Sequence, residues 1–180
     1  MNKKLLILSI AAILAAPSAF AADPVVDTQK VNVTVPEVNL FTVSDAAVNF
    51  DLTSLKPGTA GAGFGTTAAN TTTKYAISAN NKIDGTGKNK VTVSVDKLPK
   101  GGMLTVDMAD AGVGSHPEIQ LTNGTTPVLN AVGLTNLSNV ATSDKDISYK
   151  FGPEAENGMI EFTGETAQEV TVSYTLTDDV

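Results

Sequence analysis

One serine and the only histidine of the chain are neighbours, at Ser115 and His116. A serine nucleophile needs a histidine base within hydrogen-bond reach, and a third group that orients the base. Adjacent side chains on an extended segment point to opposite faces, so these two would not meet. The chain also lacks a Gly-x-Ser-x-Gly turn, which hydrolases use to present the nucleophile. We therefore expect no serine-hydrolase chemistry.

Acidic residues occur in four close pairs that could bind a cation or act as general acids. The pairs are Asp107/Asp110, Asp144/Asp146, Glu154/Glu156 and Asp178/Asp179. Calcium takes oxygen ligands of this kind, but no pair follows the Asp-x-Asp-x-Asp-Gly spacing of a calcium loop. Glycoside hydrolysis needs two carboxylates at a fixed separation, which any acidic chain offers by chance. We expect a solvated acidic surface, and no catalytic residue, metal or cofactor.

A glycine-rich run at 61–65, Gly-Ala-Gly-Phe-Gly, superficially resembles a phosphate-binding loop. Such a loop must open a helix, whereas this run leads toward another predicted strand. We expect a flexible surface loop in which Phe64 is the exposed aromatic, with Tyr75, Tyr149 and Tyr174 in or beside the core. Because sugar-binding faces stack rings on exposed aromatics, and the chain has no Trp, an extracellular ligand- or carbohydrate-binding module is only the alternative function.

Composition excludes several classes of protein. The chain has no Cys, all of its 12 basic residues are Lys, and 19 acidic residues give a net charge of -7. Without Cys there is no disulfide framework, thiolate zinc site or cysteine nucleophile. Without Arg the bidentate group that best binds phosphate is missing. An acidic chain does not suit nucleic acid, which requires a basic patch. We expect a protein that is not an enzyme.

The beginning of the chain has the pattern of an export signal. Two lysines precede an apolar run at 5–16, and Ala-Phe-Ala follows at 19–21. This order predicts a signal peptide of 21 residues, cleaved between Ala21 and Ala22. The apolar run is too short to span a bilayer, which takes about 20 residues. We expect an exported protein, periplasmic or on the surface of a bacterium, with no membrane span in 22–180.

The remainder of the chain alternates apolar and polar residues, which predicts β-strands. The alternating segments are 31–35, 38–43, 48–52, 75–77, 91–95, 103–106, 119–121, 147–151, 159–162 and 170–176. Asn123-Gly124 is a strong hairpin signal, and a second Asn-Gly turn at 157–158 precedes the segment 159–162. Two segments, 57–73 and 129–143, fit the pattern poorly; the second could be one irregular strand plus a loop, or two very short strands.

These patterns predict an all-β fold, an antiparallel immunoglobulin-like β-sandwich of about eight to ten strands with little helix. Thr and Ser occupy much of the face opposite the apolar residues, as expected for a sheet with one face in water. We expect a single sandwich domain over 22–180, which is long enough to bury a core without disulfides.

An alternating strand lies near each end of this domain: Val-Asn-Val-Thr-Val-Pro-Glu-Val-Asn-Leu at 31–40 and Val-Thr-Val-Ser-Tyr-Thr-Leu at 170–176. With a signal peptide before them and no Cys or Trp between them, this organisation resembles bacterial secreted immunoglobulin-like domains. In outline it is similar to the Cys-free fimbrial major subunits assembled by chaperone and usher. The resemblance implies that an N-terminal strand of one subunit completes the sheet of the next.

The residues that would carry that role are Val31, Val33, Val35, Val38 and Leu40. A proline between the third and fourth of them limits an uninterrupted donor strand to the part before it. The segment 22–43 could equally form the first strands of its own sandwich, because strand addition and ordinary pairing use the same alternation. We expect a structural subunit of a surface fibre or coat, whose partners are copies of itself or other surface proteins.

Overall fold

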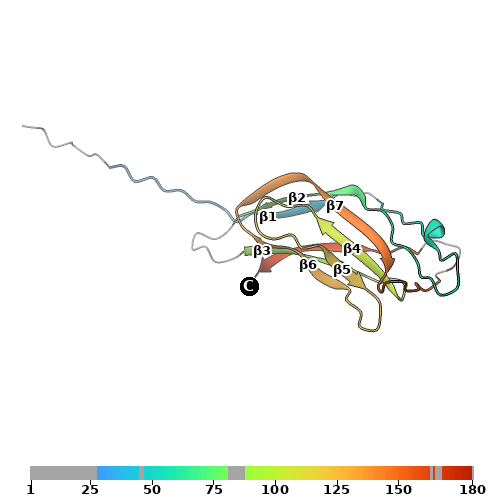
Figure 1. Ribbon diagram of the computed structural model, residues 1–180. Coiled ribbons are helices and arrows are strands. Elements are labelled where there is room, and N and C mark those ends of the chain that lie inside the picture. The colour runs from blue at the N-terminus through green and yellow to red at the C-terminus, as the bar shows by residue number, and fades with distance from the viewer. Residues whose placement is uncertain (1–27, 45–46, 81–87, 163, 165–167, 180) are drawn as a thin grey trace, which may run out of the picture. The chain divides into compact units, whose positions relative to one another are not determined.

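A computed structural model describes residues 28–44, 47–80, 88–162, 164 and 168–179. Over these residues the chain forms eight antiparallel strands in two sheets (Figure 1). Its helical content there is a single 3-10 turn, η1 (Thr53–Leu55). The predicted all-β fold of about eight to ten strands with little helix is confirmed. No helix in the described part has the length and hydropathy needed to cross a membrane.

The larger sheet contains five strands in the order β1-β2-β7-β4-β5. Their bounds are β1 (Asn39–Val43), β2 (Asn70–Ala79), β4 (Gly102–Met108), β5 (Ile119–Thr122) and β7 (Val140–Pro153). The longest strand, β7, pairs with β2 from Val140 to Tyr149 and with β4 from Ile147 to Pro153. This central strand therefore joins the two halves of the sheet.

The smaller sheet contains three strands in the order β6-β3-β8. Their bounds are β3 (Lys88–Val95), β6 (Asn130–Leu137) and β8 (Val172–Asp179). Every second residue of β3 is buried, from Asn89 to Val95, because a strand presents alternate side chains to opposite faces. In β3 the valines point inward and Thr92 and Ser94 point outward, as the alternation predicted.

The core lies between the two sheets and is built from their inward-facing apolar side chains. Fully buried members are Tyr75 and Ile77 of β2, Val91 and Val93 of β3, Val106 and Met108 of β4, Leu134 and Leu137 of β6, and Ile147 of β7. Since both sheets contribute, neither can keep its apolar face dry without the other. Tyr75 and Tyr149 are buried as predicted, and Tyr174 is half-buried at the core edge.

Contacts divide the chain into two units, residues 1–35 and residues 36–180. In the first unit, the described residues 28–35 form no strand, although alternation predicted one at 31–35. The predicted signal peptide and its cleavage site between Ala21 and Ala22 lie outside the described residues. The predicted single domain over 22–180 stays a prediction.

Two further predicted strands, 48–52 and 159–162, are also wrong. Both segments alternate in sequence, yet neither pairs with another strand in the described residues. The Asn-Gly turn at 157–158 does form, with Asn157 at φ 57° and a hydrogen bond from Gly158 N to Ala155 O at 2.8 Å. Alternation records which side chains are apolar, but a strand also needs a neighbour that accepts its backbone hydrogen bonds.

The connection around Asn123-Gly124 differs from the tight hairpin that its sequence suggests. The residues Thr122 and Val128 exchange two backbone hydrogen bonds, of 2.8 and 3.0 Å, around a longer loop. The strands on either side, β5 and β6, belong to different sheets, so this connection has to cross the sandwich. In segment 129–143 the structure has β6 and the start of β7, both longer than expected, joined by a turn with Asn139 at φ 48°.

Candidate functional site

Two edge strands, β1 and β8, lie in contact with each other on one side of the sandwich. Within the described residues, β1 pairs only with β2 and β8 only with β3. Each strand therefore has one backbone edge with no ladder partner. We call the inward-facing residues of these strands, Phe41, Val43, Val172, Tyr174 and Leu176, the open edge. Unpaired strand edges of this kind can accept an additional strand.

The open edge is less covered than the rest of the core. Three pairs in the ladder between β8 and β3 show this: Val172 opposite Val95, Tyr174 opposite Val93 and Leu176 opposite Val91. Residues directly opposite each other in antiparallel strands point to the same face. All three β3 residues are buried, whereas all three β8 residues are only half-buried. Among the described residues, the core is therefore less well covered along β8 than along β3.

Aromatic side chains connect the open edge to the centre of the core. Phe41 lies 5.9 Å from Tyr75 and 6.3 Å from Tyr174 between ring centroids, within the usual range for aromatic pairs. Since Tyr75 belongs to β2 and Tyr174 to β8, Phe41 bridges the two sheets where no backbone pairing joins them. The adjacent apolar residues Val48 and Phe50 are also half-buried against the core.

Three tyrosine hydroxyl groups are hydrogen-bonded inside this region. The hydroxyl groups of Tyr149 and Tyr174 bond to each other, and that of Tyr75 donates to Ala109 O. Burial raises the pKa of Tyr149 and of Tyr174, and burial with the nearby Asp110 raises the pKa of Tyr75 to about 12. At neutral pH all three are uncharged, so they support the structure as hydrogen-bonding groups.

The opposite side of the sandwich is closed by connecting segments. Ser115 and Thr135 exchange backbone hydrogen bonds of 3.1 and 2.9 Å along the edge of β6. The pair Thr122 and Val128 does the same at the end of β5. Natural sheets commonly protect their edges in this way. Because the edges of β1 and β8 have no such protection among the described residues, we take this side of the sandwich as the candidate site.

The five residues predicted as a strand donor fall in different surroundings. Val31, Val33 and Val35 are 75%, 77% and 72% exposed and precede the sandwich. Val38 is half-buried, and Leu40 is exposed on the outer face of β1, opposite Ser78 of β2. Val38 and Leu40 therefore belong to the unit 36–180, which contains the sandwich. The other three predicted residues are not buried by any part of the described chain.

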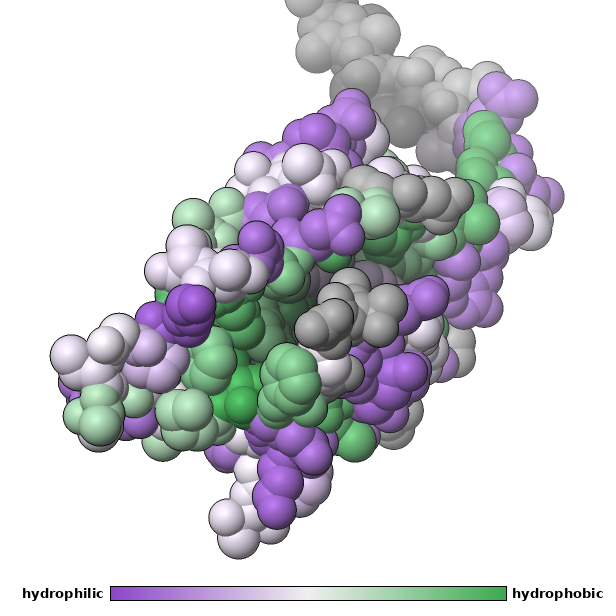
Figure 2. All heavy atoms as spheres, turned by 90° about the vertical axis from the view of Figure 1, so that its right-hand side faces the viewer, coloured by the Kyte–Doolittle hydropathy of each residue, from purple (hydrophilic) through white to green (hydrophobic). Residues whose placement is uncertain are grey.

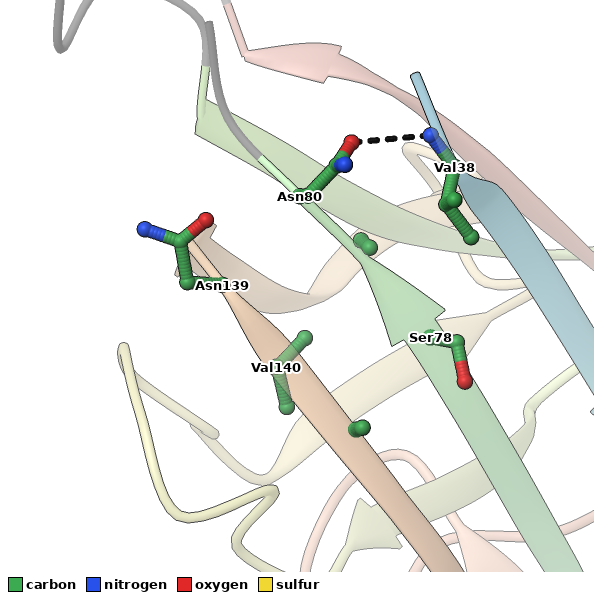
Figure 3. A pocket seen from close by; sticks show the side chains of 7 residues that line it. Val38, Ser78, Asn80, Asn139 and Val140 are labelled. Atoms are coloured by element: carbon green, nitrogen blue, oxygen red, sulfur yellow. Dashed lines mark hydrogen bonds between the residues drawn. The ribbon is translucent and has the colours of Figure 1, made fainter. Parts of the chain in front are cut away.

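A small apolar pocket lies where β1 begins, β2 ends and β7 begins (Figure 3). Its volume is about 280 Å³, and it is lined by Val38, Ser78, Ala79, Asn80, Asn139, Val140 and Ala141. No lining residue is charged. Ligand pockets usually have about 300–1,000 Å³ and several converging polar groups, so this one is small for a specific ligand.

The serine, histidine and acidic residues for which no catalytic or metal-binding role was expected form no common site in the described part of the chain. Ser115 is held by its backbone to Thr135, and both Ser115 and His116 are exposed. Asp146 pairs with Lys74 at 2.5 Å on the surface, where such pairs contribute little to stability. Within the described residues, no three His, Cys, Asp or Glu side chains come close enough together to hold a metal ion.

Phe64 was expected to be the exposed aromatic, but among the described residues the exposed aromatic is another one. Phe64 is half-buried, and its N–H donates to Gly158 O at 3.0 Å, so the glycine-rich run is attached to the 157–158 turn. Instead Phe162 is 83% exposed, on the connection between β7 and β8. Figure 2 views the end of the sandwich where this connection runs, and shows apolar surface in a hollow bordered by hydrophilic side chains. Phe162 was missed because its alternation predicted a strand.

The fold defines a class: a cysteine-free, all-β protein of two antiparallel sheets, in which β1 and β8 have no second ladder partner among the described residues. Comparison of the chain with protein-family models, curated proteins and solved structures gave no match in any of the three.

Proposed function

We propose that this protein is an exported, non-enzymatic structural subunit of a surface fibre, and that its N-terminal segment adds a strand to the open edge of a neighbouring copy. The observation that carries the proposal is the ladder between β8 and β3. Tyr174 is only half-buried although its partner Val93 is completely buried. An additional strand beside β8 would cover the exposed apolar surface and pair with its free backbone edge.

The N-terminal segment has the pattern that such a strand needs. Alternate residues of an extended chain recur on one face about every 6.6–6.8 Å. Val31, Val33 and Val35 share that spacing with Val172 and Tyr174, so valines of the incoming strand match the intervals between side chains of the acceptor. The intervening residues Asn32 and Thr34 would then face water.

Burial of the three valines favours this association. Each is more than two-thirds exposed in the single chain, and burying a valine contributes about 1.5 kcal/mol. The new backbone hydrogen bonds add roughly 0.5–1.5 kcal/mol each, against the entropy lost in ordering the segment. Because the donated segment and the open edge are different surfaces of the chain, the contact is head-to-tail, and its repetition from copy to copy builds a fibre.

Export agrees with this role. Residues 1–21 have the pattern of a signal peptide, and the subunits of a surface fibre have to leave the compartment of synthesis. The alternative, an extracellular ligand- or carbohydrate-binding module, is less well supported. The pocket beside Val38 is small and has few polar groups, and the most exposed aromatic, Phe162, stands without an aromatic partner among the described ring contacts.

Matched substitutions on the two faces of the N-terminal segment test the proposal. Val33→Asp places a charge where a donated strand would be buried, whereas Asn32→Asp places the same charge on the opposite face. The chain beginning at Ala22 should form fibres in negative-stain microscopy and oligomers in size-exclusion chromatography. Val33→Asp should abolish both, and Asn32→Asp should preserve both.

Removal of 22–35 should leave a folded monomer, which circular dichroism and sizing would identify. A chain that stays monomeric with the segment intact, or that assembles equally well with Val33→Asp, would contradict strand donation. Unfolding of the shortened chain would instead assign the segment to its own sandwich.

A further inference from the structure

The side chain of Asn80 binds the backbone at the point where the chain enters β1. Asn80 Oδ1 accepts a hydrogen bond from Val38 N at 2.8 Å, and Asn80 Nδ2 donates one to Pro36 O at 2.8 Å. The backbone N–H of Asn80 donates to Val38 O at 3.0 Å. Figure 3 shows the amide at the end of β2, turned toward Val38. One residue thus engages three backbone groups of the entering chain.

We propose that Asn80 is a positioning residue that fixes where the donated segment ends and the folded sandwich begins. This role deepens the proposed function and rests on it, because a segment is donated only if the chain assembles by strand addition. The hydrogen bonds themselves belong to the single chain and can be tested without assembly.

Backbone pairing alone would hold this position weakly. The ladder between β1 and β2 has five pairs and ends at Asn39 opposite Ala79, and β1 has no partner on its other side among the described residues. A shift of one residue would turn Leu40 inward and Phe41 outward. Asn80 extends the attachment past the last pair, using its side chain where a second ladder partner is missing.

The attachment divides the predicted donor residues into two sets. Residues from Pro36 onward are tied to β2, so Val38 and Leu40 remain in the sheet of their own subunit. The residues free to enter a neighbour are Val31, Val33 and Val35. A fixed end gives every donated segment the same length, and hence gives every copy in a fibre the same distance to the next.

Limited proteolysis measures this boundary directly. With a protease of broad specificity, mass spectrometry should place the N-terminus of the resistant fragment at or just before Pro36. Asn80→Ala should move it several residues toward β1, and should lower the hydrogen-exchange protection of Val38 N–H about tenfold. The matched control is Asn70→Ala at the start of the same strand, where the side chain bonds only to Thr72. It should change neither.

A second variant separates the hydrogen bonds from a general loss of structure. In Asn80→Asp, an ionised carboxylate still accepts from Val38 N but cannot donate to Pro36 O. At pH 7 this variant should therefore keep the hydrogen-exchange protection of Val38 N–H, whereas its resistant fragment should begin after Pro36. The wild-type chain, measured at the same pH, is the reference for both readings.

The proposal fails if Asn80→Ala leaves the fragment boundary and Val38 protection unchanged, or if Asn80→Asp leaves the fragment boundary unchanged at pH 7. It also fails if Asn70→Ala produces the same losses. These measurements use dilute single chains, so their outcome is independent of the assembly tests. Fibres without the Asn80 effect would remove only the positioning role, and the Asn80 effect without fibres would remove only strand donation.

Discussion

The core contains tyrosine side chains, whose hydroxyl groups can ionise. Tyr75 is almost completely buried and donates to Ala109 O. Tyr149 and Tyr174 bond to each other across the two sheets. Ionising any of them would place a negative charge in apolar surroundings, which is costly. The fold should therefore depend on pH in the alkaline range through these groups.

We predict that the free energy of unfolding falls as the pH rises from 10 to 12. The pKa of Tyr75 is about 12 in the folded chain, against an ordinary value of 10.0. In this interval the unfolded chain binds fewer protons than the folded one, so stability decreases with pH. Below pH 10 the contribution is fully present. Urea denaturation at several pH values between 9 and 12 measures the slope.

The variant Tyr75→Phe assigns this effect. It cannot ionise, so its unfolding free energy should decline less steeply over the same interval, although its hydrogen bond to Ala109 is lost and its starting stability is lower. Tyr149 and Tyr174 have raised pKa values as well and should supply the slope that remains. An identical slope in the variant and the wild type would show that Tyr75 keeps an ordinary pKa.

At the scale of elements, alternation predicted β3 correctly, and this strand pairs with a neighbour on each side, β6 and β8. Val91, Val93 and Val95 of β3 alternate and are buried as expected. The segments 48–52 and 159–162 alternate equally well but have no ladder partner. Pairing depends on strand order, which is set by contacts between residues far apart in the sequence.

The candidate site divides in the same way. The alternation of Val31, Val33 and Val35, on which the proposed donor role depends, could be recognised in the sequence because the pattern is local. The open edge could not, since it depends on which strands become the last in each sheet. The hydrogen bonds of Asn80 could not be predicted from the sequence either, because its partners Pro36 and Val38 lie more than 40 residues away in the chain.

The turn between β3 and β4 offers a test of local geometry. Gly101 has φ 75°, and a Cβ there would lie 2.4 Å from Met159 O. We predict that Gly101→Ala lowers the free energy of unfolding by about 2–3 kcal/mol, from backbone strain combined with this close approach. Chemical denaturation of the variant measures the loss.

Two other glycines separate the causes. Gly112 has φ 91° with open space around it, so Gly112→Ala should cost about 1 kcal/mol from backbone strain alone. Gly58 has neither constraint, and Gly58→Ala should stay within about 0.5 kcal/mol of the wild type. Equal losses at Gly101 and Gly112 would exclude a contribution from Met159 O.

At the scale of the whole molecule, the described residues protect the strand edges on one side of the sandwich and leave the edges of β1 and β8 unpaired on the other. The segments around Ser115 and Val128 protect the edges of β6 and β5, while the open edge has no such cover in the described residues. A protein with this asymmetry can gain stability from a strand that it does not contain. Its stability should therefore depend on the concentration of donor strand.

We predict that a peptide of residues 22–35 stabilises the chain from which the same residues have been removed. A ligand that binds only the folded state, at a hundred times its dissociation constant, adds about 2.7 kcal/mol. The melting temperature should rise by several degrees in differential scanning fluorimetry. The peptide carrying Val33→Asp should have no effect, and the peptide carrying Asn32→Asp should act like the original. Equal shifts with all three peptides would indicate non-specific binding.

If the chain assembles by strand donation as proposed, the attachment of Pro36 and Val38 also determines how each subunit bears tension. Tension transmitted through the N-terminal segment enters the sandwich at Pro36, and along the axis of β1 it is shared by all five pairs with β2 and by the bonds to Asn80. Bonds loaded together in shear must break together, whereas bonds loaded from one end break in turn. A filament of such subunits would resist stretching through the short strand β1, and its weakest element under tension would be that five-residue ladder.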